Sequence, residues 1–213
     1  MRRYARPTIK PRKVPVQARS TQLVADIVRA AVRVLEREGP HKFTTVRVAE
    51  TAGVSVGSLY QYFPNKQSIL YRLQADEWSR TSEAIDSILQ DEGKPPAARL
   101  RAMVRFFFHS ECDEAPFRLA LDAAAPEYHS APESRAHRVR GQRIWRRFME
   151  SAAPRATPAE RAFAAQLVLM TVTALGKQVS EKNLTRAQVT RWADAVSDML
   201  LGALARYGSK RPS

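Results

Sequence analysis

Apolar side chains recur at helical spacing along most of this chain, which indicates a protein built of helices. In the segment from residue 20 to residue 38, four apolar residues share one helix face: Leu23, Ile27, Ala30 and Val34. Gly39-Pro40 ends this predicted helix, and Phe43 is expected to fill the core beneath the helices that follow. No stretch of useful length alternates apolar and polar residues as a strand does. We therefore expect an all-α fold.

The same spacing predicts about nine helices, three before residue 66 and six beyond it. The fourth is a long helix over residues 66–89, and a short apolar helix is expected between Pro116 and Ala125. Capping boxes mark the starts of the last three helices, because a hydroxyl and a carboxylate or amide three residues later can satisfy free backbone N–H groups. These boxes begin at Ser130, Thr157 and Thr185.

Two short helical segments meet at Gly53-Val54-Ser55, and their pattern is typical of a helix-turn-helix. Leu59 and Phe63 are four residues apart, so both point toward the same side of the second segment. Gly53 can take the positive φ that ends the first helix, and the Ser55 hydroxyl can cap the second. In a helix-turn-helix the second helix enters the major groove of DNA.

The face of the second segment opposite Leu59 is polar and uncharged, as a base-reading surface should be. We expect four residues to point outward there: Gly57, Ser58, Gln61 and Tyr62. Gly57 lets the backbone approach DNA closely, Ser58 can bond to several base edges, and Gln61 can make two hydrogen bonds to adenine. Val56 is expected near the groove floor, where it can touch a thymine methyl group.

Further residues are expected to hold the phosphate backbone. Thr45 and Ser55 start the two helices, where a hydroxyl and free backbone N–H groups can bind a phosphate. Tyr60 and Tyr62 offer phenol hydroxyls, and Lys66 supplies a point charge.

The stretch from Thr45 to Lys66 reads T-V-x-V-A-x-x-A-G-V-S-x-G-x-L-Y-x-Y-F-x-x-K. It resembles the tetracycline-repressor (TetR) family of one-component bacterial transcription regulators. The resemblance is close over roughly the first third of the chain and covers the rest only in length and helical character. It implies that the long helix after Lys66 connects a DNA-binding domain to a regulatory domain, and that the regulatory domain binds a small inducer.

Positive charge is concentrated where this motif lies. Residues 1–66 contain 13 Lys and Arg against 4 Asp and Glu, a net charge of +9, and the rest of the chain carries +5 of the total of +14. Such an excess favours a polyanion as partner, with double-stranded DNA first, because the basic segment lacks the apolar face of a lipid-binding helix.

Residues 1–19 are basic throughout, and Pro7, Pro11 and Pro15 oppose helix formation there. Two interpretations are compatible. The segment is a disordered, solvated tail, or it is an arm that lies on phosphates or enters the minor groove once DNA is present.

Cysteine and membrane signals are sparse. Cys112 is the one cysteine, which excludes an internal disulfide and a CxxC metal site and favours a reducing cytoplasm. The sequence has no run of about 18 apolar residues and no secretory leader, so we expect no membrane span. His109 and Cys112 share a helix face, but two further metal ligands are not identifiable. We therefore expect no metal and no cofactor.

Gly53-Val-Ser55-Val-Gly57 also matches G-x-S-x-G, the nucleophile elbow of serine hydrolases. That elbow follows a strand, whereas a helical segment precedes Ser55 in this chain. We therefore expect no enzymatic activity and keep a hydrolase that uses Ser55 only as an alternative. A second alternative is a protein that binds DNA without regard to sequence.

Large side chains in the second part of the chain can form core or pocket, and core is the default. Four of them are the residues we expect to line an inducer cavity: Phe107, Trp145, Met149 and Met170. On the last helix, four residues form a face that suits pairing of the last two helices with a second copy: Trp192, Val196, Met199 and Ala203. Packing of this face within its own subunit is the alternative.

These patterns predict a homodimeric repressor that binds a palindromic operator and is released by a small apolar or aromatic effector. The expected organisation has three parts. Residues 1–19 form a basic arm, residues 20–66 a three-helix helix-turn-helix DNA-binding domain, and residues 67–213 a six-helix ligand-binding and dimerisation domain.

Overall fold

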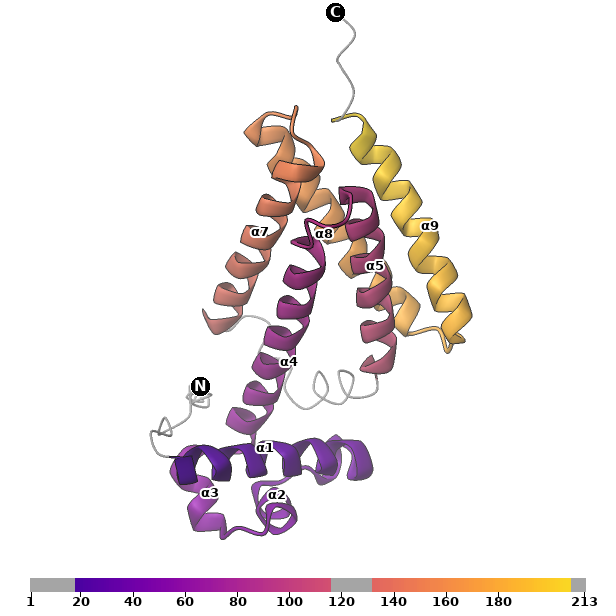
Figure 1. The fold of residues 1–213 in the computed structure, drawn as a ribbon. Helices are drawn as coiled ribbons and strands as arrows, with labels where there is room; N and C mark the ends of the chain where they lie inside the picture. Colours follow the sequence, from indigo (N-terminus) through magenta and orange to yellow (C-terminus); the bar gives the residue numbers. More distant parts are fainter. Residues whose placement is uncertain (1–17, 116–131, 208–213) are drawn as a thin grey trace, which may run out of the picture. The chain divides into compact units, whose positions relative to one another are not determined.

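The computed structural model describes residues 18–115 and 132–207, with side chains from residue 139 onward in the second range. Within these residues every regular element is helical, with eight α-helices and one short 3-10 helix, so the all-α expectation is confirmed (Figure 1). The short helix expected between Pro116 and Ala125 lies outside the described residues, as does Ser130 of the first capping box.

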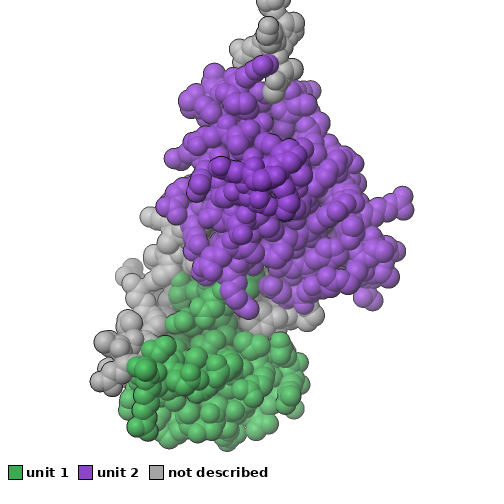
Figure 2. Space-filling view, in the orientation of Figure 1, with its two compact units in different colours: residues 1–78, 116–134 green, residues 79–115, 135–213 purple. Residues whose placement is uncertain are grey.

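The chain divides into two compact units (Figure 2). The first comprises residues 1–78 and 116–134, and the second residues 79–115 and 135–213. The described helices of the first unit are α1 (Ala18–Glu38), the 3-10 helix η1 (Pro40–Lys42), α2 (Thr45–Ala52), α3 (Val56–Tyr62) and the first half of α4 (Lys66–Leu89).

Two glycines end helices in the first unit by adopting a left-handed backbone. Gly39 has φ 76° directly after α1, and Pro40 then begins η1. Gly53 has φ 69° at the end of α2, and its backbone N–H bonds to the carbonyl groups of Ala49 and Glu50. The predicted role of Gly53 is confirmed.

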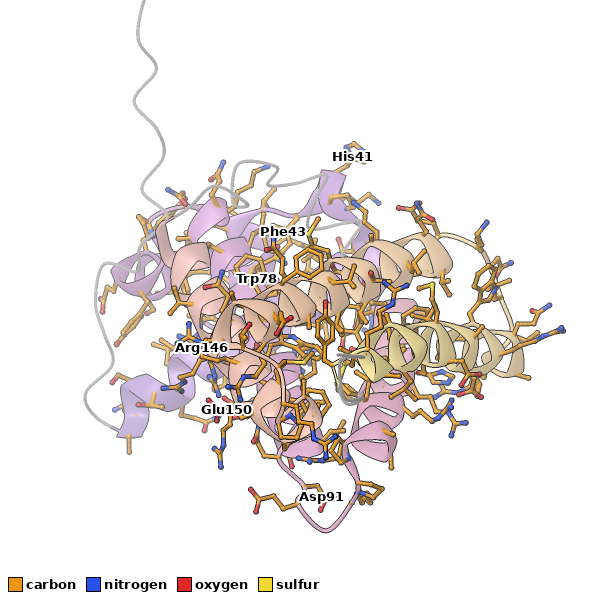
Figure 3. All side chains as sticks on the ribbon, turned by 90° about the horizontal axis from the view of Figure 1, so that it is seen from above. His41, Phe43, Trp78, Asp91, Arg146 and Glu150 are labelled. Carbon is orange, nitrogen blue, oxygen red and sulfur yellow. The ribbon has the colours of Figure 1, made fainter. Side chains whose placement is uncertain are left out.

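The core of the first unit is a single cluster to which α1, α2, α3 and α4 all contribute. Phe43 is almost completely buried there, as predicted, whereas His41 two residues before it stands at the edge of the protein (Figure 3). The same cluster contains further fully buried apolar side chains: Ile27, Ala30, Val48, Leu59 and Leu70. Burial of these side chains fixes α2 and α3 against α1, since each large apolar group contributes about 1.5–3 kcal/mol.

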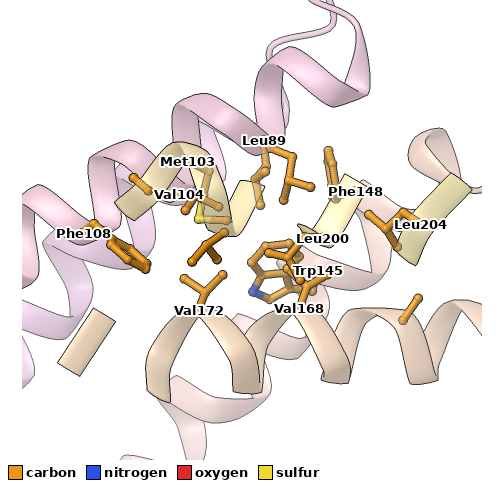
Figure 4. Packing of buried hydrophobic residues seen from close by; sticks show 14 of the residues in the cluster. Leu89, Met103, Val104, Phe108, Trp145, Phe148, Val168, Val172, Leu200 and Leu204 are labelled. Atoms are coloured by element: carbon orange, nitrogen blue, oxygen red, sulfur yellow. The ribbon is translucent and has the colours of Figure 1, made fainter. Parts of the chain in front are cut away.

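The second unit consists of the end of α4 with α5 (Pro96–Asp113), α7 (Pro132–Ala152), α8 (Pro158–Ser180) and α9 (Arg186–Ala205). Helix α5 packs against both α8 and α9, and all five helices contribute buried side chains to one core (Figure 4). The predicted capping boxes are present at both α8 and α9: Thr157 exchanges bonds with Glu160, and Thr185 with Gln188.

A buried arginine joins three helices of this unit. Arg99 on α5 donates from Nη1 to the carbonyl oxygen of Leu89 at 2.8 Å and from Nη2 to the Ser151 hydroxyl at 3.0 Å. Its guanidinium also lies 5.5 Å from the ring centroid of Phe148. The side chain thus satisfies a carbonyl at the end of α4 while it connects that end to α5 and α7.

Helix α8 differs from expectation in its hydropathy. It is long and apolar enough to cross a membrane by length and composition alone, although the sequence analysis anticipated no such segment. One face packs into the core through Ala164, Val168 and Val172, and the opposite face exposes Phe163 and Met170. Apolar side chains on two faces of one helix account for this hydropathy, and length and composition alone are weak grounds for a membrane span.

Candidate nucleic-acid interface

The turn between α2 and α3 fixes the start of α3 through a side-chain cap. Ser55 has an extended backbone, and its Oγ accepts the backbone N–H of Ser58 at 3.0 Å. Leu59, one turn into α3, is fully buried, and the Phe63 N–H closes the last turn on the Leu59 carbonyl at 2.9 Å. A cap at one end and a buried leucine in the middle therefore fix which face of this seven-residue helix meets solvent.

The solvent-facing side of α3 carries most of the residues that the sequence predicted. Gly57, Tyr60 and Gln61 are exposed, whereas Val56 and Ser58 are half-buried at the edge. The Ser58 hydroxyl lies 2.8 Å from the Ser55 hydroxyl, so one of the two donates a hydrogen bond to the other. The exposed surface of α3 is therefore polar, uncharged and open to a ligand.

Tyr62 departs from the prediction. Its side chain is 6% exposed and belongs to the core of the first unit, so the expectation that it faces outward is wrong. Tyr62 follows Leu59 by three residues, and that spacing returns it to nearly the same face of the helix. Tyr60 is the tyrosine that projects outward, with 39% of its surface exposed.

Tyr60 and Thr45 join the two helices of the motif. The Tyr60 hydroxyl lies 3.0 Å from Thr45 Oγ1, which stands in the first turn of α2. Two hydroxyls therefore meet beside the free backbone N–H groups that begin α2, an arrangement suited to a phosphate.

Sequence reasoning missed Thr44, the residue that caps α2. Its Oγ1 accepts the backbone N–H of Arg47 at 3.1 Å, and its own backbone is extended. The signal was available, because a threonine directly before an apolar helical stretch is a normal N-cap. Thr45, which was predicted to start the helix, is its first residue.

Helix α4 presents a cation at its start. Lys66 is its first residue and is exposed, and no ion pair is found for its ammonium among the described side chains. Asn65 fixes this end, because its Oδ1 accepts the Ser68 N–H at 2.8 Å and its carbonyl accepts the Ser68 hydroxyl at 2.7 Å. The charge of Lys66 thus stands at a defined helix end.

Arg47 differs from Lys66, because neighbouring carboxylates neutralise it. Its Nε donates to Glu38 at 2.9 Å and its Nη1 to Glu50 at 3.2 Å. The hydrogen bond from Arg47, helped by the charges of Arg47 and Lys42, lowers the pKa of the Glu38 carboxyl. Glu38 is therefore fully ionised at neutral pH, and Arg47 serves as a brace between α1 and α2 more than as a free cation.

A hollow of about 640 Å³ lies beside the cap of α3, within the first unit. It is bounded by the start of α1, through residues that include Arg19, Gln22 and Asp26, and by the turn, through Ser55 and Ser58. Arg19 brings an exposed guanidinium to this place from the end of the basic segment that the sequence analysis singled out.

The four residues proposed to line an inducer cavity separate into two pairs. Trp145 and Met170 line a groove of about 820 Å³ between α7 and α8, hereafter the α7–α8 groove. Phe107 instead packs where α5 crosses α8, and Met149 is completely buried in the core. Neither of these two side chains lines the groove.

The four residues proposed for a dimer face also differ in exposure. Trp192 and Met199 are exposed, and Ala203 is half-buried. Val196 is only 4% exposed and packs in the core of its own subunit. Three exposed apolar residues lie on α8: Phe163, Leu167 and Met170. Sequence reasoning missed the first two and assigned Met170 only to the inducer cavity. Their helical spacing was visible, but the equally apolar core face of α8 obscured it.

The structure gives local structural roles to the G-x-S-x-G match and to His109. Ser55, the serine of the G-x-S-x-G match, follows helix α2 and caps α3, so the strand that a nucleophile elbow requires is absent before it. His109 Nε2 lies 2.9 Å from the Thr190 hydroxyl, a contact that joins α5 and α9.

Comparison with known families gives two matches that together span most of the chain. Residues 27–73 match the pattern of bacterial regulatory proteins of the tetR family, and residues 95–207 match the tetracyclin repressor-like C-terminal domain. The second match alone covers just over half of the chain.

Individual relatives agree with these matches. The chain is 31% identical over 135 residues to the HTH-type transcriptional regulator BetI of Serratia proteamaculans, covering 62% of this chain and 67% of that protein. It is 32% identical over 66 residues to the fatty acid metabolism regulator protein of Bacillus subtilis, covering 31% of this chain and 34% of the other. The fold is similar to that of a TetR/AcrR-family transcriptional regulator from Thermobifida fusca, with a TM-score of 0.65, 18% identity and coverage of 92% and 100%.

Proposed function

Because this chain belongs to the TetR family of DNA-binding transcriptional regulators, we propose that it is a homodimeric repressor that binds a palindromic operator and responds to a small effector. The family is not enzymatic, which removes the hydrolase alternative built on Ser55. The proposal rests on the exposed polar face of α3, which the Ser55 cap and the buried Leu59 hold in place.

We assign base reading to α3 and phosphate binding to the helix starts. Gln61 is exposed and uncharged, so it can pair with adenine, while Gly57 allows close approach and Val56 and Ser58 lie at the edge. The Thr45–Tyr60 hydroxyl pair, the start of α3 at Ser55 and the ammonium of Lys66 serve the phosphates. Tyr62 is reassigned to the core.

Dimerisation is proposed through α8 and α9. Phe163, Leu167 and Met170 form an exposed apolar stripe on α8, and Trp192 and Met199 extend the exposed apolar surface on α9. Apolar side chains exposed to water do not stabilise a monomer. A second copy related by a two-fold axis presents the same stripe, so the two stripes bury each other. This pairing gives a four-helix bundle and replaces Val196 of the sequence hypothesis by residues of α8.

Effector control is proposed to act through α4, which runs without interruption from Lys66 to Leu89. A ligand in the second unit that favours one position of this helix alters the separation of the two recognition helices in the dimer. Couplings of this kind are worth about 1–3 kcal/mol, or about 5–150-fold in DNA affinity. We also propose that the protein acts in the cytoplasm. Its domains are proposed to divide at residues 19 and 66, with residues 1–19 as an arm.

The alternative of sequence-blind DNA binding is tested by comparing two substitutions. Gln61→Ala is expected to lower affinity for the preferred duplex by about 5–150-fold, the range for a lost bidentate base contact, and to leave affinity for random duplex unchanged. Lys66→Ala is expected to weaken binding to both duplexes alike and to reduce the salt dependence by about one phosphate contact. Mobility-shift titrations at several salt concentrations measure both effects.

A matched control is Glu92→Ala, a change of an exposed side chain in the loop between α4 and α5, which should alter neither titration. If both variants lose the same factor on specific and random duplex, the division between base reading and phosphate binding is wrong. If the wild-type protein prefers no duplex at all, it binds DNA without regard to sequence.

A further inference from the structure

The α7–α8 groove combines an apolar floor with charged walls. Its volume of about 820 Å³ lies within the range of small-molecule sites, and it opens along one side between the two helices. The floor is formed by side chains that are apolar or aromatic: Trp145, Ala162, Ala165, Leu169 and Met170. Trp145 is buried and meets Phe148 edge-on, with ring centroids 5.9 Å apart and an angle of 85°. This contact holds the Trp145 ring in place at the floor of the groove.

Guanidinium groups stand on both walls of the groove. Arg146 comes from α7 and Arg161 from the first turns of α8, and neither side chain has a salt-bridge or hydrogen-bond partner among the described residues. Some other arginines of this unit do have ion-pair partners, for example Arg105 with Asp194 and Arg186 with Asp113. Two unpaired guanidiniums that face one groove from different helices are suited to grip one anionic group.

One carboxylate limits the charge that the groove accepts. Glu150 follows Arg146 by one helical turn on α7 and also lines the groove (Figure 3). With two arginines and one glutamate, the groove carries a formal charge of +1. This balance matches a single negative charge and disfavours a polyanion, because a second anionic group meets the Glu150 carboxylate.

We propose that the α7–α8 groove binds an amphipathic monocarboxylate, with its apolar body on Trp145 and Leu169 and its carboxylate between Arg146 and Arg161. The assignment of this ligand as the effector rests on the proposed function; the binding site itself does not. The competing occupant is a second copy of the chain, since Met170 lines the groove and also belongs to the exposed stripe of α8.

The experiment uses the full-length protein without DNA and isothermal titration calorimetry. The probes are straight-chain carboxylates from hexanoate to dodecanoate, 4-phenylbutyrate, and the primary alcohol and trimethylammonium compound of each chain length. We expect at least one carboxylate to bind more than tenfold more tightly than its alcohol and its trimethylammonium analogue. Arg146→Gln and Arg161→Gln should each weaken that binding by about tenfold or more, as the loss of a charge-assisted hydrogen bond does.

Two further variants control for structure. Arg143→Gln removes an exposed guanidinium of α7 that does not line the groove, and it should bind the carboxylate as the wild type does. Ala165→Trp fills the groove and should abolish binding. Circular dichroism and thermal melting establish that each variant is folded, and size-exclusion chromatography gives its oligomeric state.

The proposal is overturned if no carboxylate binds, if alcohol and carboxylate bind equally, or if the two arginine variants bind as Arg143→Gln does. If no carboxylate binds and Ala165→Trp also dissociates a dimer, the groove is occupied by a second copy. The proposed function is tested separately, by measuring whether the carboxylate releases the protein from DNA. If the carboxylate binds as described but never releases DNA, the site stands and its role as effector site fails.

Discussion

Gly53 carries the backbone conformation on which the turn between α2 and α3 depends. Its φ of 69° lies in the region that L side chains rarely adopt, and its N–H closes the end of α2. A β-carbon placed on it would meet no atom within 4 Å, so any cost of substitution comes from the backbone alone. The residue therefore isolates one physical effect.

Gly53→Ala is predicted to lower the free energy of unfolding by about 1–2 kcal/mol, the cost of a left-handed backbone for an L residue. Gly141→Ala is the matched control, because this helical glycine of α7 also has open space around it and lacks a positive φ. Alanine at that position should stabilise the protein by about 0.5–1 kcal/mol. Urea denaturation measures both, and losses of equal sign and size would show that φ is not the cause.

At this scale the sequence predicted what local chemistry decides and missed what packing decides. The roles of Gly53, Ser55 and Phe43 follow from φ, hydroxyl capping and apolar size, and all three are confirmed. Tyr60 and Tyr62 are two residues apart on a helix of seven residues, and either ring is apolar enough to be buried. Packing around Leu59 decides which of the two rings is buried. That packing involves residues from several helices, so a local pattern does not predict it.

Whole helices were easier to predict than their contacts. The expected helix over residues 66–89 agrees with the observed Lys66–Leu89, and the capping boxes mark α8 and α9 because a box is complete within four residues. Arg99 was not foreseen, because its partners Leu89 and Ser151 lie on other helices. No local pattern marks an arginine that will be buried.

The crossing of α5 and α8 is one such contact, and it depends on Gly176. A β-carbon at this position would lie 2.8 Å from Cε1 of Phe107, closer than such atoms approach in proteins. The absent side chain is what allows Phe107 to pack onto the backbone of α8. Helix α8 therefore combines a close crossing on one face with an exposed apolar stripe on the other.

Gly176→Ala is predicted to destabilise the protein by about 1–3 kcal/mol, as overpacking does, with a lower midpoint in thermal melting. Phe107→Leu should relieve the contact, so the double variant should be more stable than the sum of the two single changes predicts. A double-mutant cycle measures this coupling. If the stability changes of the two single variants simply add up in the double variant, the contact with Phe107 is not the cause of the destabilisation by Gly176→Ala.

For the whole molecule, charge and apolar surface assign different tasks to different parts of the chain. In the proposed function, the net charge of +9 on residues 1–66 provides affinity for phosphate, and the uncharged face of α3 provides the base contacts. The exposed apolar stripe of α8 supports the proposed pairing with a second copy. We therefore propose that the protein reads DNA as a pair of half-sites, because one seven-residue helix contacts few base pairs.

The most direct test of this account is selection of the duplexes that the full-length protein binds from a random pool, followed by alignment of the enriched sequences. The account predicts two inverted half-sites whose centres lie about 34–36 Å apart, or a multiple of that distance, along the duplex. Enrichment of a single unpaired half-site, or no enrichment over the starting pool, would contradict it.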